Sequence, residues 1–304
     1  MDVKSFNQPV IKGVKLTKML PQGTALVLEG GGTRGFYSAG VFDAFIDAGI
    51  MFPYIIGVSA GAANALTYIA GQRGRSREII EKYVGDHRYI SRRNILRHGS
   101  VFGFKFIFET IPDKHVFWDE DVFRAADIRF LTGTTDCVTG NPVWFEKDHI
   151  SRGFTVTKAS CSVPLAAKIM RYNGLELLDG GVSAPIPIEK SIDDGNTFHV
   201  IVLTRNKGYV KPAFQKKGIL KLYYRKYPKL IEAMINRHDV YNRQLALCEE
   251  LEREGKALII RPLVKLSVDR TAADVSKLLA LYDEGHEEGL LAIKSYLETA
   301  FTAG

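Results

Sequence analysis

The chain has 304 residues, of which 46% are hydrophobic and 25% are charged, and these values exclude disordered, collagen-like and fibrous classes. Its three cysteines, Cys137, Cys161 and Cys248, are too few and too far apart for a disulfide framework or a CxxC zinc site, which indicates a reducing, cytoplasmic compartment. The net charge of +7 favours an anionic partner: a membrane surface, an acidic substrate or a nucleic acid.

We expect neither a signal peptide nor a membrane span. Residues 1–22 carry lysines but no apolar run long enough for a secretory signal. Residues 48–72 carry no charge and are long enough to span a bilayer. However, Pro53, Asn64 and four glycines interrupt this stretch, so a buried strand, a turn and a helix explain it better.

The first two thirds of the chain alternate short apolar runs with helix-like periods. Residues 24–29 and 53–58 predict buried strands, and residues 35–48 and 60–70 predict the helices that follow them. Further strands are expected at 128–135, 142–146, 166–172 and 198–204, and further helices at 119–126 and 154–162. This alternation favours an α/β fold with a mostly parallel central sheet.

Composition divides the chain into three parts: an N-terminal segment at 1–23, an α/β domain at 24–204, and a basic, mainly helical extension at 205–304. The boundary near residue 205 rests on residues 205–229, which hold nine Lys and Arg and no Asp or Glu. Helical patterns follow at 230–254 and 271–300, with a strand pattern at 257–261 between them. Inside the α/β domain, residues 73–118 are basic and aromatic and predict an irregular insertion.

A glycine-rich loop directly follows the first predicted strand and opens the first helix. It runs Gly30-Gly31-Gly32-Thr33-Arg34-Gly35. Glycines let backbone N–H groups approach a negative oxygen, and the helix N-terminus adds partial positive charge. The loop therefore predicts an anion site, although a tight turn for strand–helix packing would use the same residues.

The second predicted strand leads into Gly57-Val58-Ser59-Ala60-Gly61, the GxSxG pattern of a nucleophile elbow. In such an elbow the turn is sharp, and its small flanking residues allow the serine hydroxyl to stand above the sheet. The strand–turn–helix context supports this interpretation, and a purely structural serine is the alternative.

A third motif, Asp179-Gly180-Gly181, follows an apolar run and could be a simple hairpin turn. Its functional interest is that Asp179 could serve as the acid partner of Ser59. A serine nucleophile needs a base, and His199 is the histidine in the usual Ser…Asp…His order. His199 lies in a predicted buried strand, whereas a catalytic histidine needs a mobile loop.

Taken together, the three motifs resemble those of the patatin-like phospholipase family: Gly-Gly-Gly-x-Arg-Gly, Gly-x-Ser-x-Gly and Asp-Gly-Gly. The resemblance extends to residues 159–164 (ASCSVP), which are similar to the family's Ala-Ser-x-x-x-Pro segment, and it covers residues 24–200. The last third of the chain resembles the extension of bacterial patatin-like proteins. Glu29 stands where many members have Asp, and Asp-Gly-Gly replaces Asp-Gly-Ala; both departures concern fine geometry.

The resemblance implies a three-layer α/β/α sandwich with a catalytic domain at 24–204 and a Ser–Asp dyad without histidine. Ser59 would be the nucleophile and Asp179 its base. An oxyanion hole would come from the loop of Gly30, Gly31, Gly32 and Arg34. The remaining motif glycines would support these turns: Gly35, Gly57, Gly61, Gly180 and Gly181. The implied reaction is hydrolysis of a lipid carboxylic ester, of phospholipase A or lysophospholipase type, through an acyl-enzyme and without cofactor or metal.

Three alternatives stay open at this point. A Ser-His-Asp esterase would use His199. A non-catalytic lipid-binding scaffold could keep the same fold. A dinucleotide-binding protein would use the glycine loop, but it would need an acidic residue at the end of the second strand, where Val58 and Ser59 stand.

Two segments bear on the substrate. Phe102, Phe104, Phe106 and Phe108 recur at period two, so on a strand all four rings would share one face and could form an acyl-chain wall or lid over Ser59. A basic cluster with interleaved tyrosines suits an anionic membrane surface, and a solvated helix face is the alternative. Its members are Lys216, Lys217, Lys221, Arg225, Lys226 and Lys229, with Tyr223, Tyr224 and Tyr227. We expect a phospholipid or other lipid ester as substrate, peripheral contact with an anionic membrane, and no nucleic acid.

Overall fold

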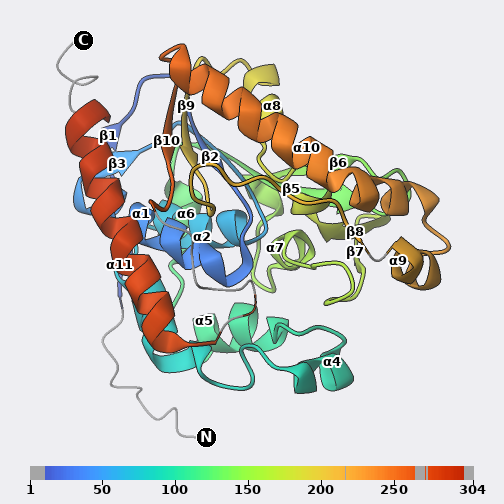
Figure 1. Ribbon diagram of the computed structural model, residues 1–304. Coiled ribbons are helices and arrows are strands. Elements are labelled where there is room, and N and C mark those ends of the chain that lie inside the picture. The colour runs from blue at the N-terminus through green and yellow to red at the C-terminus, as the bar shows by residue number, and fades with distance from the viewer. Residues whose placement is uncertain (1–10, 216, 264–270, 272, 298–304) are drawn as a thin grey trace, which may run out of the picture.

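The computed structural model describes residues 11–215, 217–263, 271 and 273–297, and Figure 1 shows strands at the centre with helices around them. The strands are β1 (Lys18–Met19), β2 (Thr24–Leu28), β3 (Ile50–Met51), β4 (Tyr54–Val58), β5 (Arg129–Asp136), β6 (Pro142–Glu146), β7 (Met170–Tyr172), β8 (Leu175–Asp179), β9 (Phe198–Val202) and β10 (Ala257–Ile260). The α-helices are α1 (Phe36–Asp47), α2 (Ala60–Ile69), α3 (Arg75–Ile79), α4 (Arg92–His98), α5 (Ile111–Lys114), α6 (Glu120–Ala125), α7 (Thr155–Ser160), α8 (Ile188–Asp193), α9 (Lys217–Tyr223), α10 (Pro228–Arg253) and α11 (Val275–Ala292). Shorter turns are the 3-10 helices η1 (Gly32–Gly35), η4 (Lys147–His149) and η5 (Gly180–Val182), and the π-helices η2 (Ile80–Val84), η3 (Phe106–Thr110) and η6 (Ile293–Leu297).

The central sheet has eight strands in the order β10-β9-β2-β4-β5-β8-β7, with β6 paired to β5. The run from β10 to β5 is parallel, while β6 and β8 pair antiparallel to β5. The predicted α/β class with a mostly parallel sheet is therefore confirmed. Because parallel neighbours end at the same edge, the turns after β2 and β4 lie side by side at the carboxyl edge of the sheet.

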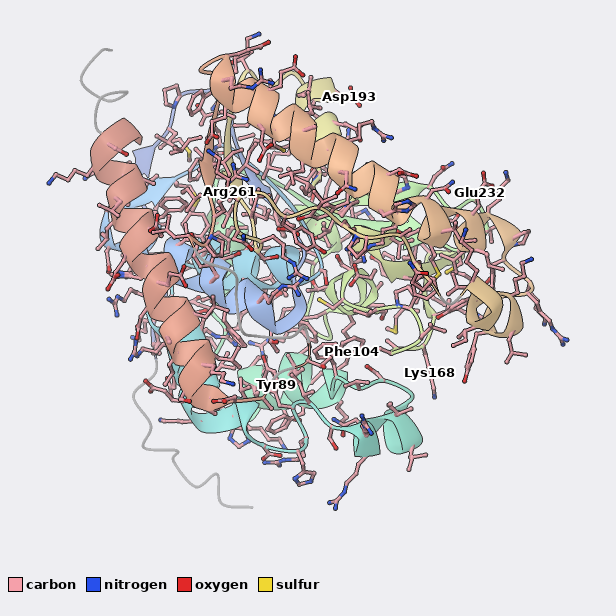
Figure 2. The ribbon with its side chains drawn as sticks, viewed as in Figure 1. Tyr89, Phe104, Lys168, Asp193, Glu232 and Arg261 are labelled. Carbon is pink, nitrogen blue, oxygen red and sulfur yellow. The ribbon has the colours of Figure 1, made fainter. Side chains whose placement is uncertain are left out.

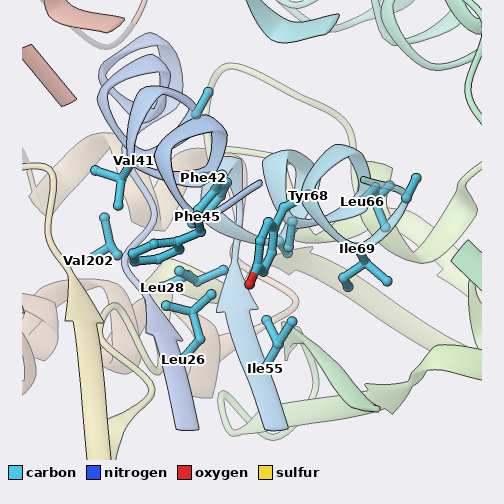
Figure 3. Packing of buried hydrophobic residues seen from close by; sticks show 14 of the residues in the cluster. Leu26, Leu28, Val41, Phe42, Phe45, Ile55, Leu66, Tyr68, Ile69 and Val202 are labelled. Atoms are coloured by element: carbon cyan, nitrogen blue, oxygen red, sulfur yellow. The ribbon is translucent and has the colours of Figure 1, made fainter. Parts of the chain in front are cut away.

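Both faces of the sheet are covered, which confirms the three-layer arrangement. Side chains alternate along β2: Leu26 and Leu28 pack into one core, and Ala25 and Val27 pack into the other. The first core contains residues of α1, α2 and α11, and Figure 3 shows part of it, with Phe42 and Phe45 of α1 above Leu26 and Leu28. The second core contains residues of α8 and α10. This double burial explains why β2 and β4 read as continuous apolar runs.

The C-terminal region beyond residue 205 packs on the same sheet. Strand β10 extends the parallel sheet beside β9, α10 covers the second core and α11 lies against α1 (Figure 1). The α1–α11 contact is so close that a Cβ on Gly285 would clash with the carbonyl oxygen of Tyr37, and a Cβ on Gly40 would clash with that of Tyr282. Glycine at these two positions therefore permits the contact. The domain boundary near residue 205 stays a prediction.

The segment 73–118 is more regular than the sequence indicated. It contains α3, α4 and α5 and the π-helices η2 and η3, so the prediction that it is irregular is wrong, while its being an insertion stays a prediction. Buried Arg75 ties the segment together, because its guanidinium donates to the carbonyl oxygens of Val116 and Phe117 and to the hydroxyl of Thr67. Backbone carbonyls accept hydrogen bonds from the guanidinium without neutralising its charge, and burial lowers the pKa of Arg75 to about 10. Composition does not reveal such an arrangement. Among the described residues, no helix is both long and apolar enough to cross a bilayer.

Candidate active site

Ser59 lies on a sharp turn between β4 and α2. Its backbone angles, φ 53° and ψ −129°, fall outside the regions that L-residues ordinarily occupy. The flanking glycines permit this turn. A Cβ on Gly61 would lie 2.7 Å from the carbonyl oxygen of Glu29, and one on Gly57 would lie 2.9 Å from the backbone nitrogen of Ala62. The GxSxG pattern thus forms the elbow geometry expected of it.

Strand register brings Asp179 to Ser59 from 120 positions along the chain. Val58 of β4 is paired with Gly133 of β5, and Thr134 of β5 is paired with Asp179 of β8. The Ser59 hydroxyl donates a 2.8 Å hydrogen bond to Oδ2 of Asp179. Both residues are only 6% exposed. This is the separation that direct transfer of a proton from serine to carboxylate requires.

The Asp-Gly-Gly turn fixes the carboxylate of Asp179. The backbone N–H of Gly181 donates to Oδ1 of Asp179 at 2.7 Å, and the Thr135 hydroxyl donates to the Asp179 carbonyl at 2.9 Å. Gly180 is needed for space, because a Cβ there would clash with the carbonyl of Gly133. Asp179 ends β8 and caps the short η5 helix, so the predicted simple hairpin turn is not what forms.

The glycine loop runs directly beside Ser59. A Cβ on Gly30 would lie 3.0 Å from the Cβ of Ser59, and one on Gly31 would lie 2.8 Å from the hydroxyl of Thr204. Gly32 has φ +61°, a left-handed conformation that glycine adopts without strain. Arg34 is buried in the η1 turn that follows. The loop is therefore a close-packed backbone wall next to Ser59, the placement expected of an anion site.

Two supports of the site were not assigned a role from the sequence. The Ser160 hydroxyl accepts the backbone N–H of Ser59 at 2.8 Å and donates to the Gly133 carbonyl at 2.6 Å. Glu29, the departure from the family pattern, accepts the backbone N–H of Thr204 at 2.5 Å through Oε2. The signal for Ser160 was present in the Ala-Ser-x-x-x-Pro segment. Glu29 offered none beyond its position before the glycines.

An apolar cavity of about 570 Å³ opens in front of Ser59. None of its lining residues that the structure describes is charged. The wall includes Phe36, Phe102, Phe104, Ile107 and Phe108, with Tyr89 and Val163. Figure 2 places Tyr89 and Phe104 on the side of the molecule that carries α4 and α5. The apolar, uncharged lining has the character of a site for a hydrocarbon chain.

The strand predicted at the phenylalanines is wrong, although three of them reach the cavity. Phe104 opens a helical stretch that continues into η3, so Phe104 and Phe108 share one helical face, with ring centroids 5.9 Å apart. Phe102 stacks on Phe104 from a short bridge before the helix. Phe106 points elsewhere, against Tyr83. A period of two places four aromatic residues on one face of a strand, but it also fits two faces of a helix. In this helical segment, Phe104 and Phe108 line the cavity while Phe106 packs against Tyr83.

A second cavity, of about 520 Å³, is also lined by Ser59. It is bounded by the glycine loop, by Asp179 and Gly181, and by Arg237 of α10. The Arg237 Nε–H donates to the Gly181 carbonyl. Ser59 therefore lines both cavities: an apolar one without charged lining residues, and one whose described lining includes Asp179 and Arg237.

The histidine alternative does not fit the structure. His199 is at the start of β9, paired with Ala25, while Ser59 follows the far end of β4. Its Nδ1 lies 3.1 Å from the Ser191 hydroxyl, and burial lowers its pKa to about 4.

Cys161, in contrast, lines the apolar cavity beside Ser59, and burial raises the pKa of its thiol. Among the described residues, no group of three or more potential metal ligands is present.

Comparison with known proteins agrees with this geometry. A family model described as patatin-like phospholipase matches residues 26–191, and a second model, described as a domain of unknown function, matches residues 227–300. The uncharacterized protein YjjU of Escherichia coli is 27% identical over 212 residues, which are 68% of this chain and 59% of that protein. The chain thus matches less than two thirds of that relative's length.

Among solved structures, VipD from Legionella pneumophila is similar over 97% of this chain and 72% of that chain, with a TM-score of 0.46 and 13% identity. The family assignment rests on the first model, which covers more than half of the chain. The chain therefore belongs to the patatin-like phospholipase family, a family of lipid-ester hydrolases.

Proposed function

We propose that the protein hydrolyses carboxylic esters of lipids through a Ser59–Asp179 dyad. The observation that carries this proposal is the 2.8 Å hydrogen bond from the Ser59 hydroxyl to the Asp179 carboxylate. Ser59 lies on a nucleophile elbow, beside the glycine loop, and lines an apolar cavity. A serine that was merely structural would need none of these three neighbours.

The proposed cycle has two halves. Ser59 Oγ attacks the ester carbonyl carbon while Asp179 Oδ2 accepts the hydroxyl proton. The tetrahedral intermediate then collapses, the proton passes to the departing alkoxide, and an acyl-enzyme remains on Ser59. In the second half a water attacks the acyl carbonyl, Asp179 takes its proton, and the returning Ser59 oxygen is reprotonated. The products are a free fatty acid and the deacylated alcohol.

An aspartate base places a large demand on the oxyanion site. A free aspartate has a pKa near 3.9, so it is a weak base at neutral pH. Stabilisation of the negative carbonyl oxygen must therefore lower much of the barrier, and one donor is typically worth about 3–4 kcal/mol. The backbone N–H groups of Gly31 and Gly32, next to Ser59, are the donors we assign, with Gly30 and Arg34 holding the loop.

The reaction is tested with Ser59→Ala and Asp179→Asn on esters of graded chain length, using a fluorophosphonate to label the nucleophile. Ser59→Ala should lose both labelling and turnover, and Asp179→Asn, which keeps the size of the side chain, should lose turnover by at least ~10³-fold. Ser276→Ala is a control away from the site, because Ser276 is on α11 and its exposed hydroxyl donates to Asp274. Folded wild-type protein that neither labels nor hydrolyses, in the presence or absence of vesicles, would instead favour a non-catalytic lipid-binding scaffold.

Contact with an anionic membrane is the second part of the proposal, and helix α9 supports it. Lys217, Lys221, Arg225 and Lys226 are exposed, and Leu222 between them is 75% exposed. Exposed cations with an exposed leucine suit the boundary between headgroups and acyl chains. Of the tyrosines in this cluster only Tyr223 is exposed, since Tyr224 is buried and Tyr227 donates to Glu176. Lys216 lies outside the described residues.

The α9 surface is close to the cavities. The Tyr224 hydroxyl accepts the backbone N–H of Leu165 at 2.8 Å, and Val163 of the same loop lines both chambers. On the other side of this loop, Lys168 lies against Gly99 at the end of α4, and Figure 2 shows Lys168 on that side of the molecule. Leu96 of α4 is 90% exposed. A membrane resting on α4 and α9 would therefore meet the entrance to the site.

Co-sedimentation with vesicles tests this contact. Reversing Lys221 and Arg225 to Glu should abolish binding to vesicles with 30% phosphatidylglycerol, and Leu222→Ser should weaken it several-fold. Reversing Arg243 and Lys256, which are exposed on α10 and beyond it, is the charge-matched control. Equal loss in both pairs would indicate a general effect of net charge, and no loss in either would exclude α9 as the contact.

A further inference from the structure

We infer that Arg237 of α10 forms a subsite for the phosphate-bearing half of the substrate, on the leaving-group side of Ser59. This inference rests on the proposed function and specifies its substrate class. It also assigns a role to the region at 227–300, which matches a domain of unknown function. The argument has three steps: the asymmetry of the two chambers, the anchoring of the guanidinium, and the path of an ester across Ser59.

The two chambers that meet at Ser59 differ in charge. The described residues around the apolar chamber carry no charge, and phenylalanines dominate its wall. Around the second cavity, which we call the charged chamber, Arg237 is the cation among the described lining residues, and Asp179 is the anion. A further cavity of about 600 Å³ is also lined by Asp179, Gly181 and Arg237. Arg237 therefore borders both cavities whose described lining includes the Asp179 carboxylate.

The guanidinium of Arg237 is held in a defined place. Its Nε–H donates to the Gly181 carbonyl, while the Gly181 N–H donates to Asp179, which accepts from Ser59. A Cβ on Gly181 would lie 2.9 Å from Asp179 Oδ1 and 3.3 Å from Arg237 Nη2, so both groups flank this turn. The positive charge thus offsets the carboxylate that lines the same chamber. An arginine so placed can bind a phosphate oxygen through its terminal nitrogens.

An ester bound at Ser59 must cross from one chamber to the other. Its acyl chain fits the chamber without charge, so its alcohol portion leaves on the side of the charged chamber, towards Arg237. In a glycerophospholipid or a lysophospholipid, that alcohol carries a phosphodiester only a few bonds from the ester oxygen. An anionic group at that distance would meet Arg237, whereas a monoacylglycerol offers the same acyl ester without the charge. The structure thus predicts a preference between two otherwise similar esters.

The experiment compares decanoyl lysophosphatidylglycerol with monodecanoylglycerol, both kept monomeric, for wild type and variants. Arg237→Gln should lower the ratio of kcat/KM for the anionic over the neutral ester by about 10- to 100-fold, the loss expected for a charge-assisted hydrogen bond. Arg237→Lys should keep part of the ratio, because lysine keeps the positive charge but lacks the paired terminal nitrogens of the guanidinium. Arg243→Gln, on the same helix and exposed, should leave both values unchanged.

Each outcome decides the inference. An equal loss on both esters would mean that Arg237 only positions the Gly181 turn, and an unchanged ratio would also overturn the subsite. Binding of sn-glycerol 3-phosphate, measured by calorimetry, does not depend on turnover. Wild-type binding that Arg237→Gln removes would support the subsite even if the esters were not hydrolysed, and absence of wild-type binding together with absence of any ester preference would reject it. Failure of the dyad is seen separately, as loss of fluorophosphonate labelling in the wild type.

Discussion

The backbone N–H of Ser59 donates to the hydroxyl of Ser160 at 2.8 Å, and these two residues lie 101 positions apart. The same hydroxyl donates to the Gly133 carbonyl at 2.6 Å. Ser160 ends α7, so it joins that helix to both β4 and β5 at the point where Ser59 adopts its unfavourable backbone angles. A buried group that is both donor and acceptor holds the elbow from behind, which explains a serine at this place in the Ala-Ser-x-x-x-Pro segment.

Ser160→Ala should therefore destabilise the elbow and the fold together. It leaves the Ser59 N–H and the Gly133 carbonyl without this partner, which should reduce the free energy of unfolding by about 2–4 kcal/mol. We also expect kcat to fall at least ~10-fold, because the nucleophile loses its fixed position. Urea unfolding and ester turnover measure the two effects.

Ser162→Ala is the control for this prediction. Its hydroxyl is equally buried in the same segment, but it donates to the Lys158 carbonyl and has no contact with Ser59 in the hydrogen bonds of the described region. We expect a comparable loss of stability per hydrogen bond with much less effect on kcat. If both variants lowered kcat equally, the role assigned to Ser160 at the elbow would be wrong.

Phe104→Asp should change the chain-length preference. On the wall of the apolar chamber, Phe104 stacks on Phe102 and meets Phe108 edge-on. Each buried methylene of a bound chain contributes about 0.8 kcal/mol. A carboxylate in this wall should lower kcat/KM for decanoyl esters at least ~10-fold more than for butyryl esters. Phe117→Asp, at an exposed position outside the cavity lining, should lower neither. Equal activity of Phe104→Asp on long and short esters would refute the acyl-wall hypothesis.

The thiol of Cys161 should be unreactive although it lines the same cavity as Ser59. Burial and the negative charge of Asp179 raise its pKa, and burial raises the pKa of Cys137 to about 12 and that of Cys248 further. Because the thiolate is the reactive form, native protein at pH 8 should resist iodoacetamide. All three thiols should react in guanidinium chloride. Rapid modification of Cys161 in the native state, read by mass spectrometry, would contradict this assignment.

Much of the fold was predictable from the sequence, because its signals are local. The apolar runs at β2 and β4 are short and bounded by glycines, and the parallel sheet follows from their alternation with helices. The short β8 was missed as a strand because its last residue, Asp179, belongs to a functional motif and its first residues are only half-buried. The predicted strand at 166–172 shrank to Met170–Tyr172, since β8 is its antiparallel partner and begins only at Leu175.

The proximity of Ser59 and Asp179 could be predicted, because each residue lies in a motif with its own signal, while their catalytic roles stay a prediction. A residue whose proposed role depends on a distant contact could not be found in this way. Arg237 is one basic residue on a helix of 26 residues, and no sequence spacing relates it to Gly181. The secondary structure of the phenylalanine segment was mispredicted for another reason. Its period of two was interpreted as a strand, although the residues between the rings, Lys105 and Ile107, are equally compatible with a helix.

His199 provides a prediction on stability rather than on catalysis. Burial lowers its pKa to about 4, against 6.5 for a free histidine. Between these two values the unfolded chain binds more protons than the folded one, so stability is full above pH 6.5 and falls as pH decreases towards 4. From pH 7 to pH 5 this group alone should remove about 2 kcal/mol from the free energy of unfolding. Urea titrations at several pH values measure the slope.

His199→Gln isolates that contribution and tests the triad alternative in the same protein. The variant should start from a lower stability at pH 7, because the contact with Ser191 is changed, but its stability should depend less on pH between 7 and 5. Its ester turnover at pH 7, corrected for the folded fraction, should equal that of wild type, since Asp179 rather than His199 contacts Ser59. A loss of turnover as large as that of Asp179→Asn would restore the histidine mechanism. His199 lies near the start of β9, away from the edge of the sheet where Ser59 follows β4, so altered packing around it should not cause such a loss.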